Sequence, residues 1–158
     1  MMINRITADL NAFARLPQAD LVGFVGSNEK PIQGPVGYLD WLLAGAISRL
    51  IERQIFHARK FEKLLFSIQG PFASRLGQRR LFLFGLGDTS VEEIEAYTEI
   101  ILQTHLTLSE ANVTATILML PSSYPSPQIH SCFLDQLSDS PMADKIVLFL
   151  QDSDPHGI

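Results

Sequence analysis

The sequence predicts an α/β domain in three layers, with a mixed, mostly parallel sheet and helices on both of its faces. The main observation is the apolar run Leu81 to Phe84, which has no polar alternation and therefore indicates a strand that meets water on neither face. A glycine turn, Gly85 to Gly87, and then a segment with helical spacing follow this strand. Strand and helix patterns alternate elsewhere too, so we expect about five or six strands.

Length and composition fit one compact domain over residues 1–158, in which the polar tail 151–158 is expected to fray. The chain is 46% hydrophobic and only 18% charged, which favours an apolar surface covered by a partner. A net charge of -5 without a long basic cluster argues against nucleic acid and membrane surfaces. The single Cys132, with no signal-peptide or membrane-span pattern, predicts a cytoplasmic protein.

In the first half, residues 3–13 fit an edge strand or a helix, and we favour the strand. Leu21 to Val25 is predicted as a buried strand, in which Gly23 marks a close approach of another element. After the loop Gly26 to Pro31, we expect one helix from Tyr38 to about Arg53, because its apolar residues recur every three or four positions.

A short strand, Lys63 to Ile68, is ended by Gly70-Pro71, and residues 72–78 are read as a hairpin-like excursion. The helix after Gly87 has the spacing of a capping box twice, in Thr89 with Glu92 and Ser90 with Glu93. Its expected apolar positions are Val91, Ile94, Tyr97, Ile101, Leu102 and Leu108.

The last third is predicted to hold a strand at Thr114 to Leu120, a helix that starts at Pro127, and a final strand at Lys145 to Leu150. Pro141 is expected to end the last helix.

Two loops that follow strands are weak candidates for binding a ligand. Gly85-Leu86-Gly87 after a strand and before a helix has the geometry that binds phosphate, because free N–H groups and the helix dipole converge there. However, the third glycine of a dinucleotide fingerprint is replaced by Ser90, and Asp88 would repel a phosphate. A tight turn is therefore the favoured reading. The candidate residues are Gly26, Ser27, Asn28, Gly85, Gly87, Asp88 and Thr89.

No catalytic, metal-binding or cofactor-binding constellation is predicted. The four histidines include no pair at helical spacing, and His130 and Cys132 are two residues apart, so they point away from each other on a helix. Cys132 is read as a buried small hydrophobe in preference to a nucleophile. Arg79 and Arg80 could hold an anion, but two arginines ahead of a buried strand more often flank the sheet.

The segments Ala19 to Val25, Gly34 to Ile51 and Lys63 to Ile68, and above all Arg80 to Asp88, resemble the N-terminal domain of the M17 leucyl (cytosol) aminopeptidases. The resemblance implies a macro-domain-like fold. It also implies a stand-alone copy of the non-catalytic half, because the two-metal motif of the catalytic domain, Asn-Thr-Asp-Ala-Glu-Gly-Arg, does not occur in this sequence.

By this resemblance, the chain is expected to act as an assembly or accessory module, without enzyme activity, for itself or for a separate aminopeptidase-type chain. A homo-oligomer or such a protein is the expected partner. The alternative is a macro-like module that binds a nucleotide or another small ligand, since macro domains bind ADP-ribose. The loop Gly26 to Glu29 differs from theirs by having one asparagine, an acid and no glycine run.

Overall fold

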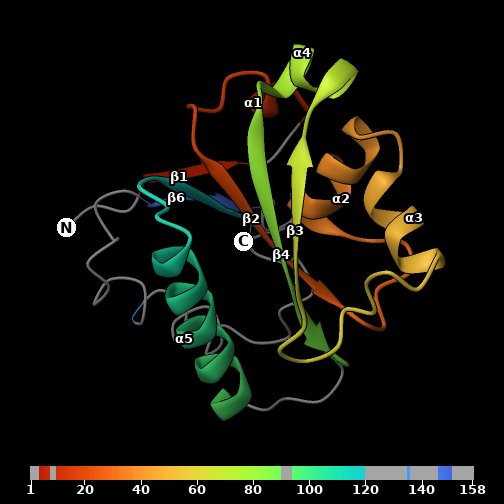
Figure 1. The fold of residues 1–158 in the computed structure, drawn as a ribbon, viewed down its shortest axis with the longest axis vertical. Helices are drawn as coiled ribbons and strands as arrows, with labels where there is room; N and C mark the ends of the chain where they lie inside the picture. Colours follow the sequence, from red (N-terminus) through yellow and green to blue (C-terminus); the bar gives the residue numbers. More distant parts are fainter. Residues whose placement is uncertain (1–3, 8–9, 90–93, 120–134, 136–145, 151–158) are drawn as a thin grey trace, which may run out of the picture.

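The computed structural model describes residues 4–7, 10–89, 94–119, 135 and 146–150, and their strands form one six-stranded sheet (Figure 1). The order across the sheet is β1-β6-β5-β2-β4-β3. Every neighbouring pair is parallel except β3 with β4, which confirms the mixed, mostly parallel sheet. The strands are β1 (Asn4–Thr7), β2 (Asp20–Gly26), β3 (Lys63–Ile68), β4 (Arg79–Gly87), β5 (Thr116–Met119) and β6 (Ile146–Leu150).

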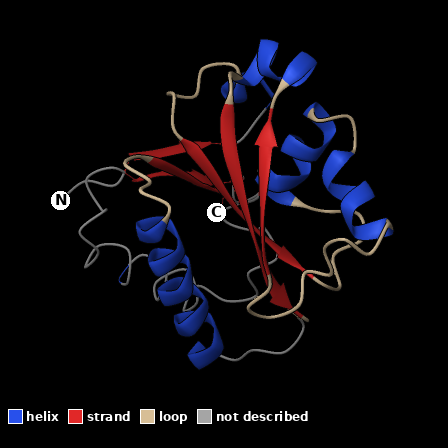
Figure 2. Ribbon diagram, in the orientation of Figure 1, coloured by secondary structure: helices blue, strands red, loops and turns tan. Residues whose placement is uncertain are grey.

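Helices cover both faces of the sheet, as Figure 2 shows: α2 and α3 lie on one side and α5 on the other. The described helices are α1 (Leu10–Phe13), α2 (Gly34–Leu42), α3 (Ala46–Glu52), α4 (Ala73–Leu76) and α5 (Ile94–Glu110). A 3-10 turn, Gly70–Phe72, precedes α4. The three-layer α/β architecture is therefore confirmed.

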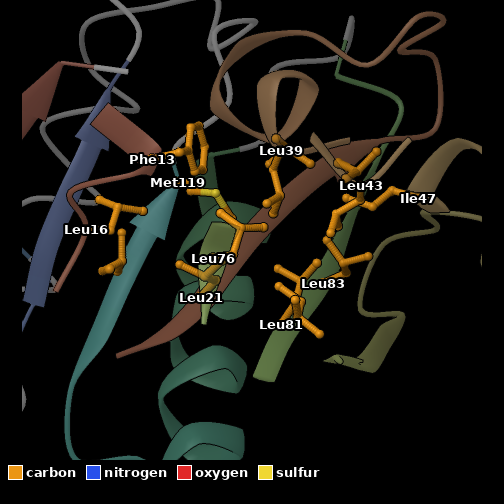
Figure 3. Close-up of a cluster of buried hydrophobic side chains, with 14 of the residues drawn as sticks. Phe13, Leu16, Leu21, Leu39, Leu43, Ile47, Leu76, Leu81, Leu83 and Met119 are labelled. Carbon is orange, nitrogen blue, oxygen red and sulfur yellow. The ribbon is translucent and has the colours of Figure 1, made fainter. Parts of the chain in front are cut away.

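The paired strands β2 and β4 separate two cores, because successive side chains of a strand point to opposite faces. Leu21 and Leu81 face α2, whereas Phe24 and Phe84 face α5 with their ring centroids 5.8 Å apart. The core on the α2 side also contains Phe13, Leu16, Leu39, Leu43, Ile47, Leu76, Leu83 and Met119 (Figure 3). The core on the α5 side also contains Val22, Phe82, Leu86, Tyr97, Ile100, Ile101, Leu108 and Leu118.

Gly23 of β2 lies directly under α2. A Cβ atom there would stand 2.9 Å from Cγ2 of Val36 and 3.3 Å from Cδ2 of Leu83. Since real Cβ atoms do not come that close to a neighbour, the missing side chain is what lets α2 pack on the strand. The predicted close approach at this glycine is confirmed.

An ion pair joins Asp20, the first residue of β2, to Arg80 near the start of β4. The Arg80 guanidinium donates to the Asp20 carboxylate at 2.6 Å and to the Ala111 carbonyl at 3.2 Å, and it also lies over the Phe82 ring. Arg79 donates to the carbonyl of Ala19 at 3.3 Å. The two arginines thus bind groups of the chain itself at the start of β4.

The prediction of one helix from Tyr38 to Arg53 is wrong, because the chain turns between α2 and α3. Ala44 and Gly45 both have positive φ angles, 52° and 77°, which no helix accommodates. The buried carboxylate of Asp40 accepts hydrogen bonds from the backbone N–H of Ile47 at 2.8 Å and of Ser48 at 3.1 Å, and from the Ser48 hydroxyl. Asp40 lies in α2 and therefore caps the N-terminus of the next helix, α3.

Other differences are local. The first segment is a strand only over β1 and continues as the short helix α1. Residues 72–78 contain α4 instead of a simple hairpin loop, and β5 begins later than predicted, at Thr116. Leu102, expected to be buried, is 48% exposed. Glu92 of the first predicted capping box, both residues of the second, the helix from Pro127 with Pro141, and the tail 151–158 lie outside the described residues.

Replacing Asp40 with alanine is expected to lower the free energy of unfolding by about 1–3 kcal/mol, because the N–H groups of Ile47 and Ser48 lose their buried hydrogen-bond acceptor. Urea denaturation monitored by circular dichroism measures the loss. Glu52→Ala, at an exposed position of the same helix, is the matched control. Equal stability of the two variants would contradict the capping role.

Candidate functional site

The two candidate loops come together at the carboxyl ends of β2 and β4, which are parallel neighbours. The backbone N–H of Ser27 donates to the Gly87 carbonyl at 2.8 Å. The side-chain oxygen of Asn28 accepts from both the N–H and the hydroxyl of Thr89, each at 3.0 Å. Residues about sixty positions apart in sequence thus form one connected cluster.

Side chains of the cluster occupy the space above Gly26. A Cβ atom on this glycine would stand 2.7 Å from Cγ2 of Thr89 and 3.0 Å from the Asn28 oxygen. Thr89 is buried, whereas Ser27, Asn28 and Asp88 are exposed. The loops therefore pack against each other at this point.

The carboxylate of Glu29 binds the backbone at the place where a ligand anion would be expected. One of its oxygens accepts from the Gly26 N–H at 3.3 Å and the other from the Gln33 N–H at 3.4 Å, and the side chain is buried. Backbone N–H groups at the end of a strand are what phosphate sites use, so an acidic side chain of the protein itself already takes these donors. Sequence reasoning noted the acid in this loop but did not foresee its bonds.

Gly85 and Gly87 belong to β4, so the predicted turn at Gly85 to Gly87 is wrong. Their N–H groups donate to the carbonyls of Glu62, at 2.8 Å, and Ala58, at 2.9 Å, which prolongs the pairing with the segment before β3. A Cβ atom on Gly85 would clash with the backbone of Ala58 and Arg59. Close backbone packing, not a ligand, therefore accounts for this glycine.

Glu62 organises the segment 57–62, a role that sequence reasoning missed. Its carboxylate accepts from the N–H groups of His57, at 3.0 Å, and Arg59, at 3.0 Å, and lies 3.4 Å from Nδ1 of His57. Partial burial raises the pKa of the carboxyl, but these hydrogen bonds and the His57 charge lower it by more, so that the pKa falls below its ordinary value. In the sequence, the only indication of this role was that Glu62 follows His57 by five residues.

Within the described residues, no group of three or more histidine, cysteine, aspartate and glutamate side chains is placed to hold a metal ion. His130 and Cys132 lie outside those residues. A helix long and apolar enough to cross a membrane is likewise not found in the described part of the chain.

Within the described residues, most of the large apolar side chains that are exposed lie on or near β3 and α5. Leu65 of β3 is 52% exposed, and Phe61 precedes the strand with 51% of its surface exposed. Leu102 and Leu106 lie one turn apart on α5, and the neighbouring Thr107 accepts a hydrogen bond from Lys63 at 3.1 Å, which links the helix to β3. We call Phe61, Leu65, Leu102 and Leu106 the exposed apolar set. Trp41 and Ile55 are also exposed, on the side of α2 and α3.

Comparison with solved structures identifies the fold. The chain is similar to the macrodomain of Mycobacterium tuberculosis DarG, with a TM-score of 0.64 and 11% identity over 94% of this chain and 97% of that one. The macrodomain of Thermus aquaticus DarG matches with a TM-score of 0.57 and 15% identity over 96% of this chain and 99% of that one.

A tomato leucine aminopeptidase mutant matches with a TM-score of 0.57 and 14% identity over 98% of this chain. The match covers 33% of the aminopeptidase, so this chain spans about a third of its length. No family model and no curated protein matches the sequence. At these identities the likeness concerns the fold alone, and the fold is macro-domain-like.

The depressed pKa of Glu62 predicts a pH dependence of stability. A carboxyl whose pKa is lower in the folded state stabilises the protein above its ordinary pKa, and this contribution is lost as the pH falls through the folded value. The free energy of unfolding should therefore be lower in Glu62→Gln than in the wild type at neutral pH, and the difference should shrink in acid. Urea titrations at several pH values measure it, with Glu52→Gln as control. A difference independent of pH would contradict the role of the charge.

Proposed function

We propose that this macro-like module is not an enzyme and acts by assembly, either with itself or with a separate aminopeptidase-type chain. The observation that supports the proposal is the exposed apolar set, because a partner that covered these four side chains would remove their apolar surface from water. The low proportion of charged residues, 18%, supports the same reading. The likeness to a leucine aminopeptidase motivates the choice of the second partner.

Binding of a nucleotide is the second candidate, favoured by the likeness to two macrodomains and by the meeting of two loops at the strand ends. The bonds of Glu29 weigh against it. A phosphate at this edge would have to displace the carboxylate from the N–H groups of Gly26 and Gln33, or lie close to its negative charge. We therefore place assembly first.

Assembly predicts that the sedimentation coefficient of the purified protein rises with concentration over roughly a hundredfold range, because association follows mass action. Velocity sedimentation measures the rise. A mixture of the protein with a leucine aminopeptidase of its own organism tests the aminopeptidase-type partner. Bovine serum albumin is the control partner. A strict monomer that also fails to shift the aminopeptidase boundary would contradict the proposal.

ADP-ribose and nucleotides are expected to leave the melting temperature unchanged. A ligand present at about 100 times its dissociation constant would stabilise the folded state by about 2.7 kcal/mol, which a thermal-shift assay detects readily. The Glu29→Gln variant, whose side chain has no negative charge but keeps an oxygen acceptor, is assayed beside the wild type to test whether the charge of Glu29 is what opposes a nucleotide. Stabilisation of the wild type by ADP-ribose would favour the nucleotide-binding alternative.

A further inference from the structure

One side of α5 exposes a stripe of acidic and apolar side chains. Its members follow one another at intervals of three or four residues, so they lie on the same side of the helix. They are Glu95, Glu99, Leu102, Leu106 and Glu110, all of which are exposed. We call these five residues the acidic stripe. No lysine or arginine occurs within α5, so every full charge that the helix itself carries is negative.

The opposite side of the sheet, which α2 and α3 cover, exposes arginine and apolar side chains (Figure 1). Arg49 of α3 and Arg53 at its C-cap are exposed one turn apart. Trp41 of α2 is 66% exposed, and Ile55, which follows α3, is 55% exposed. We call these four residues the arginine surface. Glu52 is the one acidic residue of α3, so positive charge predominates on this helix.

The charges of the two surfaces have no ionic partner within the described part of the chain. The ion pairs found there join Glu62 to His57 and Asp20 to Arg80. Helix stability does not account for Glu110 either, because a negative charge in the last turn of a helix opposes the helix dipole. These charges are therefore available to the charges of another molecule.

Charge decides which second surface the acidic stripe can meet. A contact between α5 and α5 of another copy would set glutamates against glutamates, whichever way the helices ran, and like charges in contact oppose association. The arginine surface offers the opposite charge to the same stripe. It also offers exposed apolar groups, Trp41 and Ile55, that can cover Leu102 and Leu106.

We propose that the acidic stripe of one copy of this chain docks on the arginine surface of a second copy. Glutamates then meet arginines, and apolar side chains meet apolar side chains. Because the two surfaces lie on opposite sides of the sheet, the contact is heterologous, and each pair keeps one of each surface for further copies. The inference rests on the proposed function and specifies its partner as a second copy and its surface as these two.

Charge reversal on either surface tests the contact. Glu99→Arg and Arg53→Glu are each expected to weaken self-association at least about tenfold in sedimentation equilibrium, because each sets like charges against each other. Both residues are exposed, so the variants should fold, which circular dichroism spectra and melting curves verify. Arg15→Glu makes the same change at an exposed residue outside both surfaces and should associate as the wild type does.

Mixing the two variants tests whether the contact is heterologous. The Glu99→Arg protein keeps its arginine surface, and the Arg53→Glu protein keeps its acidic stripe. An equimolar mixture should therefore associate with nearly the affinity of the wild type, although each variant alone does not. Only a contact between the two surfaces is weakened by both single changes and restored by mixing.

Salt tests the charge term without any substitution. Raising sodium chloride from about 0.05 M to about 0.5 M should weaken self-association of the wild type at least about tenfold, because dissolved ions screen exposed charges. Association that is independent of salt would contradict the contact between glutamates and arginines.

The outcomes separate this inference from the proposed function. A protein that self-associates regardless of Glu99→Arg and Arg53→Glu would overturn docking of these two surfaces and leave assembly standing. A monomer that binds the aminopeptidase would overturn the second copy alone. A monomer that binds neither would overturn both proposals.

Discussion

The structure depends on the exclusion of water from both faces of the β2–β4 pair. Leu21 and Leu81 fill one face while Phe24 and Phe84 fill the other, so neither strand can be exposed without opening a core. This pair needs a helical layer on each side, which α2 with α3 and α5 supply. It also places the ends of two neighbouring strands side by side, and so determines which loops can meet.

Acidic side chains complete the ends of these elements. Asp40 binds two N–H groups in the first turn of α3. Glu29 binds the N–H groups of Gly26, at the end of β2, and of Gln33, before α2, and Glu62 binds those of the segment before β3. In each place a carboxylate satisfies backbone donors that would otherwise need water or a ligand. The strand-end cluster therefore owes its order to hydrogen bonds within the chain, and Glu29 engages the N–H groups of Gly26 and Gln33 before any ligand arrives.

A macro-domain-like fold is compatible with quite different roles, because function resides in the side chains that a fold presents. The same architecture occurs in the DarG macrodomains and in a part of a leucine aminopeptidase. The role of this chain therefore has to be argued from its own side chains. Glu29 lies on the backbone at the strand ends, and Leu65 is half exposed on β3, the last of the described strands in the sheet. These two features direct the functional hypothesis toward protein contacts.

The sequence by itself determined the strands and the fold class. The apolar run at Leu81 to Phe84 and the segment Lys63 to Ile68 predict strands through their own side chains, and the absence of polar alternation in the first run marks burial on both faces. Only the tertiary structure decided the break between α2 and α3, the place of Gly85 inside β4, and the bonds of Glu29 and Glu62. Each of these depends on a group brought close by folding. Local spacing records which residues avoid water, whereas a hydrogen-bond partner or a free sheet edge exists only once the strands have their order in space.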